Sequence, residues 1–482
     1  MRFVRRWLLR LVFAIAATAV ILLVGRAVQS QLGPPLQLWH TFVPPDLHAA
    51  EIDHLDWPGY LAAEARTFAA VRAEVTEKLT EEDRTPDDRY FEGSPVYPGN
   101  FQQDWNRSYV LEPAGKPIGA VILLHGLTDS PYSLRHVARR YRDLGYLAIG
   151  LRTPAHGTVP AALTETQWED WIAATRLAVR EARRRVGPDA PLHMVGFSAG
   201  GAFALKYALD AIEDPTLSRP DRLVLISPMI GINPAARLAF LAELPAFLPS
   251  FAKAAWLGIV PEFNPFKYNS FPVNGARQSH NLTVVLQDQL ARLSRAGKLT
   301  TLAPVLTFQS TTDFTVSTRA VINALYNQLP ANGSELVLFD LNRNTKLGPL
   351  LRATFATATD RLVPPPPRPW TLTVIANTPD SAEVTATTTP AGQTEQTPHP
   401  MGLLYPRDVF SLSHVALPFP PSDSLYGSQP DPGENFGVHF GALAARGEVG
   451  VLIVSMDALT RISWDPFFPY LIGRIEEGIG AR

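Results

Sequence analysis

Gly196-Phe197-Ser198-Ala199-Gly200 is the most informative stretch of this chain. It has the pattern Gly-x-Ser-x-Gly and lies between the apolar run 192–197 and an alanine-rich segment that favours a helix. Small residues in a strand–turn–helix setting let the backbone turn sharply and let the helix approach the strand. The serine is then held in a strained conformation with its hydroxyl exposed at the helix amino terminus. Ser198 is therefore the candidate nucleophile.

On both sides of this turn, short apolar runs alternate with stretches of helical spacing. The predicted strands are 121–124, 146–151, 192–197, 223–226, 304–308 and 336–339, and the predicted helices are 134–144, 165–185, 200–209 and 318–329. Strands separated by helices imply a mostly parallel sheet that is covered on both faces. The expected fold class is therefore α/β, with a doubly wound sheet.

A second turn follows the strand 121–124 directly, with the sequence Leu124-His125-Gly126-Leu127-Thr128. A loop at this place directs a backbone N–H at a developing oxyanion, and the residue after the nucleophile supplies a second donor. The candidate donors are the N–H groups of Leu127 and Ala199. His125 and His156 both lie in turns, where we expect structural hydrogen bonds rather than a catalytic role.

Three stretches together resemble bacterial carboxylesterases and monoacylglycerol lipases of the α/β-hydrolase superfamily. They are His125-Gly126-Leu127-Thr128-Asp129-Ser130-Pro131, Arg152-Thr153-Pro154-Ala155-His156-Gly157-Thr158 and Gly196-Phe197-Ser198-Ala199-Gly200-Gly201. The similarity covers about residues 107 to 340 and the segment around His414. This resemblance implies the α/β-hydrolase fold, and ester hydrolysis without a cofactor by a Ser-Asp-His triad in that chain order.

The acid and the base are expected downstream of Ser198. Asp313 follows the strand 304–308 and is the candidate acid, which would hold the histidine in the required tautomer; Asp340 is the alternative. His414 is the candidate base because apolar neighbours bracket it and can fix its ring. The alternative base, His399, lies in a loop rich in Thr, Pro and Gln.

The amino terminus carries a membrane signal. Four arginines at positions 2, 5, 6 and 10 precede the uncharged apolar run 11–25, which reaches about 19 residues when 7–9 are added and so spans a bilayer. The positive-inside rule places the body on the extracytoplasmic side, periplasmic or outer. Gly25 and Ala27 have a plausible cleavage spacing, so a secreted form without the anchor is the alternative.

The helix predicted after Pro58 has one apolar stripe, formed by Leu61, Phe68, Val71, Val75 and Leu79. We expect this stripe to pack on the body. Its opposite face carries Glu64, Glu74 and Glu77, which anionic lipid would repel.

The chain divides into a membrane anchor or signal peptide, a tether with one helix, two parts of a hydrolase core, two inserted regions and a carboxy-terminal part. Their predicted bounds are 1–30 for the anchor, 31–106 for the tether, 107–228 and 303–340 for the core, 229–302 for a helical cap, 341–408 for an insertion with a β-hairpin, and 409–482 for the histidine loop and closing helix. This cap is rich in aromatic residues and is expected to select the substrate. Its aromatic side chains form either the packed core of the cap or, as a secondary interpretation, an apolar pocket for an acyl chain.

The composition of the chain excludes several classes of protein and of binding site. The chain has 482 residues, 46% of them hydrophobic and 18% charged, as in globular proteins. A net charge of −2 offers no concentrated basic face for nucleic acid. With no cysteine and no His-Glu-x-x-His spacing, we expect neither disulfides nor a metal, and no cofactor.

The expected partners are a small lipophilic ester and, through the amino-terminal helix, a membrane; the sequence indicates no protein partner. An acyltransferase or a peptidase could use the same triad, and a catalytically silent binding protein could retain the fold.

Overall fold

A mostly parallel sheet forms the centre of the computed structural model, which describes residues 2–232, 243–313, 315–341, 344–346, 350, 358–408, 411–441 and 461–480. Within these residues the sheet has ten strands in the spatial order β1-β3-β2-β4-β5-β8-β9-β10-β11-β12. The strands are β1 (Tyr109–Leu111), β2 (Gly119–Leu124), β3 (Tyr146–Leu151), β4 (Leu192–Phe197), β5 (Arg222–Ile226), β8 (Val305–Ser310), β9 (Glu335–Asp340), β10 (Thr371–Thr378), β11 (Ser381–Thr389) and β12 (Thr397–Leu404). All neighbours from β3 to β10 are parallel, whereas β1, β11 and β12 pair antiparallel at the two edges.

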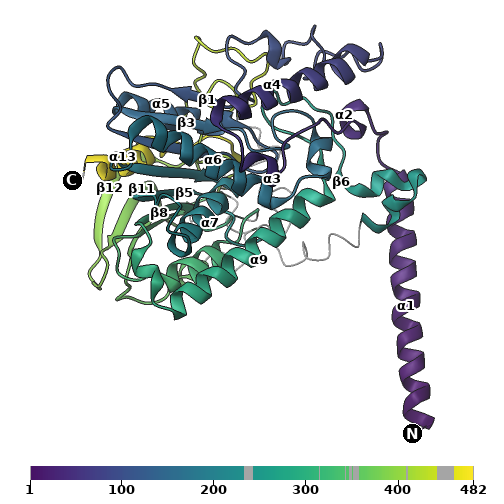
Figure 1. The fold of residues 1–482 in the computed structure, drawn as a ribbon. Helices are drawn as coiled ribbons and strands as arrows, with labels where there is room; N and C mark the ends of the chain where they lie inside the picture. Colours follow the sequence, from purple (N-terminus) through teal and green to yellow (C-terminus); the bar gives the residue numbers. More distant parts are fainter. Residues whose placement is uncertain are drawn as a thin grey trace.

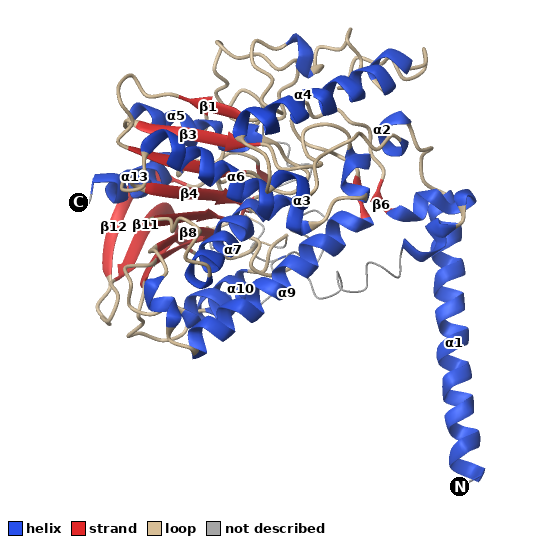
Figure 2. Cartoon of the chain, viewed as in Figure 1, coloured by secondary structure: helices blue, strands red, loops and turns tan. Residues whose placement is uncertain are grey.

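Helices cover both faces of this sheet (Figure 2). α6 (Trp168–Val186), α7 (Ala199–Glu213) and α9 (Val273–Arg295) lie on one face, and α5 (Arg135–Asp143) and α13 (Phe468–Gly480) lie on the other. Alternating side chains of β2 divide the core, because Ile122 and Leu124 pack with α6 and α7 while Val121 and Leu123 pack with α5 and α13. The predicted fold class, a doubly wound α/β sheet, is confirmed.

Shorter elements complete the described chain. Apart from the long amino-terminal helix, the remaining α-helices are α2 (Leu38–Thr41), α3 (Ala49–Ile52), α4 (Trp57–Glu74), α10 (Thr318–Ala320) and α12 (Ala358–Leu362). Short segments of 3-10 or π-helix are η1 (Thr76–Lys78), η2 (Pro98–Asn100), η3 (Pro131–Leu134), η4 (Pro160–Thr164), η6 (Leu244–Phe247), η7 (Pro249–Ala255), η8 (Lys298–Thr301), η9 (Val321–Leu325) and η10 (Tyr326–Gln328). Two small ladders pair β6 (Trp256–Gly258) with β7 (Phe271–Pro272), and β13 (Ser411–Leu412) with β14 (Arg461–Ile462).

The segment predicted as an insertion with a hairpin adds strands to the main sheet. β10 pairs parallel with β9, and then β10, β11 and β12 form an antiparallel meander. The outer strand β12 is almost fully exposed and contains Pro398 and Pro400, which lack a backbone N–H. Prolines of this kind discourage pairing with another chain at a sheet edge.

The segment predicted as a helical cap divides into two parts. Residues 233–242 lie outside the described residues. In the first part η6, η7 and the β6–β7 ladder lie beside the end of α1 (Arg2–Gln31). In the second part α9 packs its Leu282, Leu286 and Leu290 into the main core, so only the beginning of this helix is free to shape a cavity.

One long helix, α1, projects from the body (Figure 1). Within Phe3–Gln31, the most apolar 18-residue window has a mean hydropathy of 2.5 and no residue buried within the protein. Length and composition are sufficient for a membrane span, although a signal sequence has the same properties.

Candidate active site

Glycines surround Ser198 because the backbone there leaves no room for side chains. A Cβ on Gly200 would lie 1.9 Å from the carbonyl oxygen of Leu124, and one on Gly196 would lie 2.3 Å from that of Gly200. Ser198 itself has φ 54° and ψ −116°, in the left-handed half of conformational space that side chains rarely adopt. The strained turn at the end of β4 therefore has the form that the sequence pattern predicts.

Ser198, His414 and Asp313 form one hydrogen-bonded chain. Ser198 Oγ lies 3.0 Å from His414 Nε2, and His414 Nδ1 lies 2.7 Å from Asp313 Oδ2. All three side chains are buried or nearly so. The histidine ring also stacks on Phe197, with 5.5 Å between ring centroids, which restricts its rotation.

Asp313 is held by its own loop after β8. Its Oδ1 accepts the N–H groups of Thr315 and Val316 at 2.9 and 3.0 Å, and its Oδ2 accepts a hydrogen bond from Gln309 Nε2 at 3.2 Å. The sequence reasoning did not select Gln309, although a glutamine at the end of an apolar strand beside a candidate acid was a usable signal. These bonds orient Asp313 toward His414.

The alternative residues lie elsewhere. Asp340 ends β9 and accepts a hydrogen bond from the Thr359 hydroxyl at 2.8 Å. His399 lies opposite Ala386 on the exposed edge strand β12. Neither residue has a described hydrogen bond to the Ser198–His414 pair.

The two candidate oxyanion donors flank Ser198. Leu127 lines the same cavity as Ser198, in the turn after β2. Ala199 is buried at the first position of α7, where a backbone N–H has no acceptor within its own helix. The helix dipole adds positive potential at the same place.

His125 and His156 are structural. The Thr153 N–H donates to His125 Nε2 at 3.2 Å, so that nitrogen is the acceptor and Nδ1 donates to the carbonyl of Gly126 at 2.9 Å. This pairing fixes one neutral tautomer, and burial lowers the pKa of His125 well below its usual value. Burial also lowers the pKa of His156 to about 4, and its Nδ1 lies 2.9 Å from the Pro154 carbonyl oxygen.

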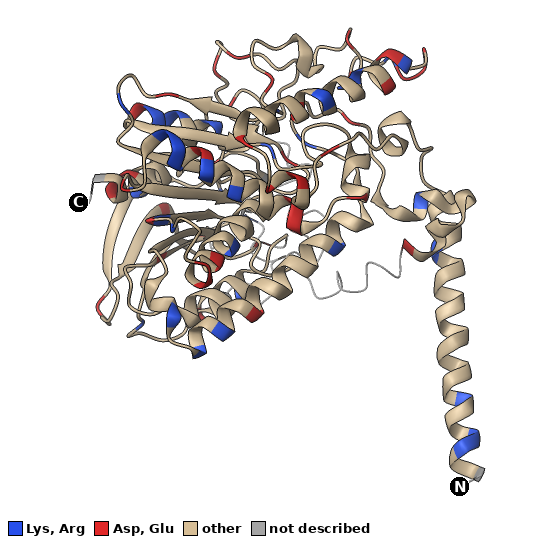
Figure 3. Cartoon of the chain, in the orientation of Figure 1, with Lys and Arg blue, Asp and Glu red and all other residues tan. Residues whose placement is uncertain are grey.

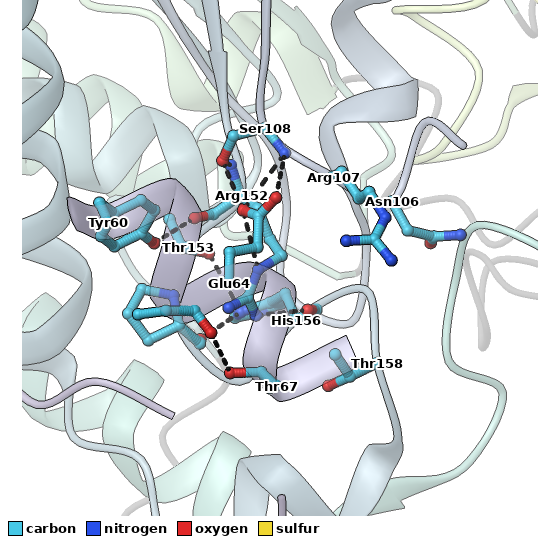
Figure 4. Close-up of polar contacts among 12 residues, drawn as sticks. Tyr60, Glu64, Thr67, Asn106, Arg107, Ser108, Arg152, Thr153, His156 and Thr158 are labelled. Atoms are coloured by element: carbon cyan, nitrogen blue, oxygen red, sulfur yellow. Dashed lines mark hydrogen bonds and ion pairs between the residues drawn. The ribbon is translucent and has the colours of Figure 1, made fainter. Parts of the chain in front are cut away.

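The turn that contains His156 rests on a buried ion cluster, which Figure 4 shows around Arg152. The Arg152 guanidinium donates to both carboxylate oxygens of Asp46 at 2.9 and 3.0 Å and to Glu64 at 3.2 Å. Glu64 also accepts the Ser108 hydroxyl at 2.7 Å. Burial alone would raise the pKa of Asp46, but the charge and hydrogen bonds of Arg152 outweigh it and lower that pKa.

This cluster corrects one sequence expectation. Glu64 was expected on the solvent face of its helix, but α4 buries it together with Tyr60 and Thr67. Of the predicted stripe, Val71, Val75 and Leu79 are buried, whereas Leu61 and Phe68 are half-buried. The pattern could not show that Arg152, far along the chain, would pair with a glutamate on the inner face.

A cavity of about 350 Å³ opens beside Ser198 and His414. Its walls are mainly apolar and include Leu127, Phe197, Met229, Ile232, Phe271, Ala276, Val316 and Val415. Lys267 is its one cationic lining residue among those the structure describes, and no described lining residue is an aspartate or glutamate. Tyr268, next to Lys267, bonds to the turns after β2 and β3. Its N–H donates to the Thr128 carbonyl at 2.7 Å, and its hydroxyl accepts the Thr158 N–H at 2.8 Å.

Comparison with known proteins identifies the class. Residues 115–342 match the Hydrolase_4 family profile, described as serine aminopeptidase, S33. A thermostable monoacylglycerol lipase of Bacillus sp. (strain H-257) is 26% identical over 207 residues, which are 42% of this chain and 72% of that protein.

The solved structures that are similar to this chain over 48% of its length include the following two. One is a metagenome-derived lipolytic enzyme from a study of LipS and LipT, with 24% identity, a TM-score of 0.38 and 86% of its own chain covered. The other is a soluble variant of monoglyceride lipase from Saccharomyces cerevisiae in complex with a substrate analog, with 16% identity, a TM-score of 0.37 and 81% covered.

The sheet order, the strained Gly-x-Ser-x-Gly turn and the family match define a serine hydrolase. The central part of the chain, residues 115–342, therefore has the fold and the family profile of an α/β-hydrolase.

Proposed function

We propose that this chain is a membrane-anchored carboxylic ester hydrolase that cleaves lipophilic esters, such as acylglycerols, through an acyl-enzyme. The observation that carries the proposal is the hydrogen-bonded chain Ser198–His414–Asp313 at the wall of an apolar cavity. The relative described as a thermostable monoacylglycerol lipase supports the same reaction class.

In the proposed mechanism, His414 Nε2 takes the proton from Ser198 Oγ as that oxygen attacks the ester carbonyl carbon. Asp313 stabilises the imidazolium and keeps Nδ1 protonated. The N–H groups of Leu127 and Ala199 donate to the oxyanion of the tetrahedral intermediate. The intermediate collapses, His414 protonates the departing alcohol, and the acyl group stays on Ser198 until water, activated by the same histidine, releases it.

The character of the cavity favours esters over amino-terminal peptides. An aminopeptidase must hold a substrate ammonium, and carboxylates are the groups that do so most strongly. The described lining offers the Lys267 cation and apolar walls instead. Its volume of about 350 Å³ is at the small end of ligand pockets, which run from about 300 to 1,000 Å³, and suits one acyl chain with a small head group.

The test begins with the full-length protein in detergent, labelled with a fluorophosphonate probe. Wild type should label at one serine, and Ser198→Ala should lose both labelling and nearly all turnover of p-nitrophenyl esters. Turnover across acyl lengths then measures the pocket. A folded wild-type protein that neither labels nor hydrolyses any ester would favour a silent binding protein.

An acyltransferase would use the same residues, so the products must be identified. With glycerol or a short alcohol added, a hydrolase continues to release mainly free acid, whereas an acyltransferase yields mainly the new ester. Dominant ester formation at low alcohol concentration would replace the hydrolase proposal.

A further inference from the structure

Residues 244–260 carry an apolar surface that the catalytic proposal leaves unused. Phe247 is 85% exposed and Leu248 is 60% exposed, although side chains of this kind are usually inside a protein. Leu244, Leu257 and Val260 are exposed nearby in the chain. Lys253 is the one charged residue from 244 to 260. We call these five side chains, Leu244, Phe247, Leu248, Leu257 and Val260, the apolar face.

The segment that bears this face is attached to the end of α1. Arg26 donates to the carbonyl oxygens of Ala254 and Trp256 at 3.2 and 2.6 Å, and Gln31 donates to that of Ser250 at 2.8 Å. Lys253 in turn donates to the carbonyl oxygen of Gly33 at 2.9 Å. Figure 1 shows η6 and η7 against the end of α1 where it meets the body.

The positions of charged residues indicate how deep in the bilayer the contact between residues 244–260 and α1 lies. Figure 3 shows α1 uncharged between its basic amino-terminal end and the body, and the sequence has no charged residue from 11 to 25. Arg26 follows this stretch directly, and Lys253 reaches the same end of α1 through its hydrogen bond to Gly33. Arginine and lysine side chains at the end of an apolar span lie at the headgroup level of a bilayer. A segment bonded to them lies at the same level.

The same segment is connected to the catalytic cavity. β6 pairs with β7, with Gly258 opposite Phe271 and Trp256 opposite Pro272. Phe271 lines the cavity, as does Ala276 near the beginning of α9. One cavity wall is thus hydrogen-bonded to the segment that contacts α1.

We infer that residues 244–260 are a second membrane-binding element, which inserts the apolar face into the interfacial zone of the bilayer and presents the cavity to esters dissolved in the membrane. This inference rests on the proposed anchorage by α1. Exposed apolar patches mark interaction sites, and continuity with a membrane-spanning helix makes lipid the occupant. The substrate class that follows is a membrane-resident lipid ester rather than a water-soluble one.

The absence of cysteine from the sequence makes a direct test possible. Single cysteines are introduced into the full chain as Leu248→Cys, Leu404→Cys or Ala16→Cys, and each is labelled with an environment-sensitive fluorophore. The proteins are reconstituted into vesicles of phosphatidylcholine and phosphatidylglycerol that carry doxyl-labelled lipid. Leu404 is the matched control because it is 72% exposed on β12, away from the segment.

We expect doxyl lipid to quench the label at 248 and at 16 but not at 404, with aqueous iodide quenching only the label at 404. Quenching at 16 without quenching at 248 overturns the inference while anchorage stands. Loss of quenching at 16 overturns the anchorage and the inference with it. A label at 248 protected from both lipid and iodide assigns the face to a protein partner and also overturns the inference.

Kinetics give a second, independent readout. We expect Phe247→Ser/Leu248→Ser to lower turnover of a monoacylglycerol embedded in vesicles by about fivefold or more, since interfacial binding depends on buried apolar area. Turnover of a soluble short-chain ester should stay within about twofold of wild type, because neither side chain lines the cavity. The control Ile118→Ser, at an apolar residue that is 58% exposed elsewhere, should leave both rates unchanged. An equal loss of turnover on the vesicle-embedded and the soluble substrate contradicts a membrane role. If the wild-type protein does not hydrolyse the soluble ester at all, the proposed function itself is refuted.

Discussion

Ser198 keeps a conformation that costs on the order of 1–3 kcal/mol because its neighbours hold it from several directions. Its N–H donates to the carbonyl oxygen of Ile226 at 2.9 Å, and its carbonyl oxygen accepts the Met229 N–H at 2.8 Å. The elbow is therefore bonded to β5 and to the chain that follows it. These two backbone hydrogen bonds hold the Ser198 hydroxyl at 3.0 Å from His414 Nε2 before any substrate binds.

Asp313→Asn should lower kcat by about 10³- to 10⁴-fold, because an amide no longer stabilises the imidazolium or selects its tautomer. The measurement is ester turnover of the full-length protein, with folding checked by circular dichroism. Asp340→Asn is the matched control and should keep turnover within about tenfold of wild type, since Asp340 bonds to Thr359. A greater loss in Asp340→Asn than in Asp313→Asn would reverse the choice of acid.

Asp88 should make stability fall as pH rises. Its Oδ1 accepts the Tyr90 N–H at 2.8 Å, whereas Oδ2 is buried without a partner among the described residues. Burial raises its pKa to about 7, above its unfolded value of 3.8, so the stability it contributes is fully present below about pH 4 and is lost as pH rises to about 7. Asp88→Asn should remove this loss and stabilise the protein at pH 8 by on the order of 3 kcal/mol.

The check for Asp88 is the thermal unfolding midpoint of both proteins across this pH range. The difference between variant and wild type should grow with pH. A constant difference at all pH values would show that the carboxyl is not titrating in this window.

At the scale of elements, α4 is fixed to the sheet by charge as well as by apolar contact. Arg152 follows β3 directly, Glu64 lies on α4, and Asp46 lies in the tether before it. The guanidinium thus joins three segments at the turn that contains His156. Buried charges of this kind hold a structure in one arrangement only while every partner is present.

Arg152→Met should destabilise the protein by about 3–5 kcal/mol, because it leaves the carboxylates of Asp46 and Glu64 without their cation. Denaturant unfolding followed by circular dichroism measures the change. The matched variant, which adds Asp46→Asn and Glu64→Gln, should recover much of the lost stability since no unpaired charge remains. Equal stability of the single variant and wild type would contradict the structural role of the cluster.

Local patterns were sufficient to predict the parallel strands and the turns at Ser198 and Leu127, because a buried strand that ends in a glycine-containing turn leaves a short apolar run followed by glycine in the sequence. They were not sufficient for α9, whose place in the main core depends on distant leucines, or for β12, whose exposed Pro-rich sequence resembles a loop. Glu64 was misplaced because its partner Arg152 lies 88 positions away. The place of Asp313 after β8 and the apolar neighbours of His414 indicate these two residues, in the chain order that the family resemblance implies. Their catalytic roles stay predictions until the variants are measured.

At the scale of the whole molecule, the proposed anchorage by α1 sets the expected location of the enzyme. We expect the full chain to stay with the membrane pellet in alkaline carbonate, and a protease added to intact cells or spheroplasts should digest the body but not the basic amino terminus. Mass spectrometry of the mature protein tests the alternative, since cleavage near Gly25 to Ala27 would release the body. Protection of the body in intact spheroplasts would contradict the proposed orientation.

The separation of Ser198 from His414 by 216 positions has a consequence for biosynthesis. Ribosomes make a chain from its amino terminus, so the serine emerges well before the base that would activate it. A partly made chain cannot complete the hydrogen-bonded triad, because His414 joins it only when most of the polypeptide has been synthesised. Under the proposed function, the membrane that receives α1 is therefore not exposed to lipolysis during insertion, and a product truncated before His414 is expected to be inactive.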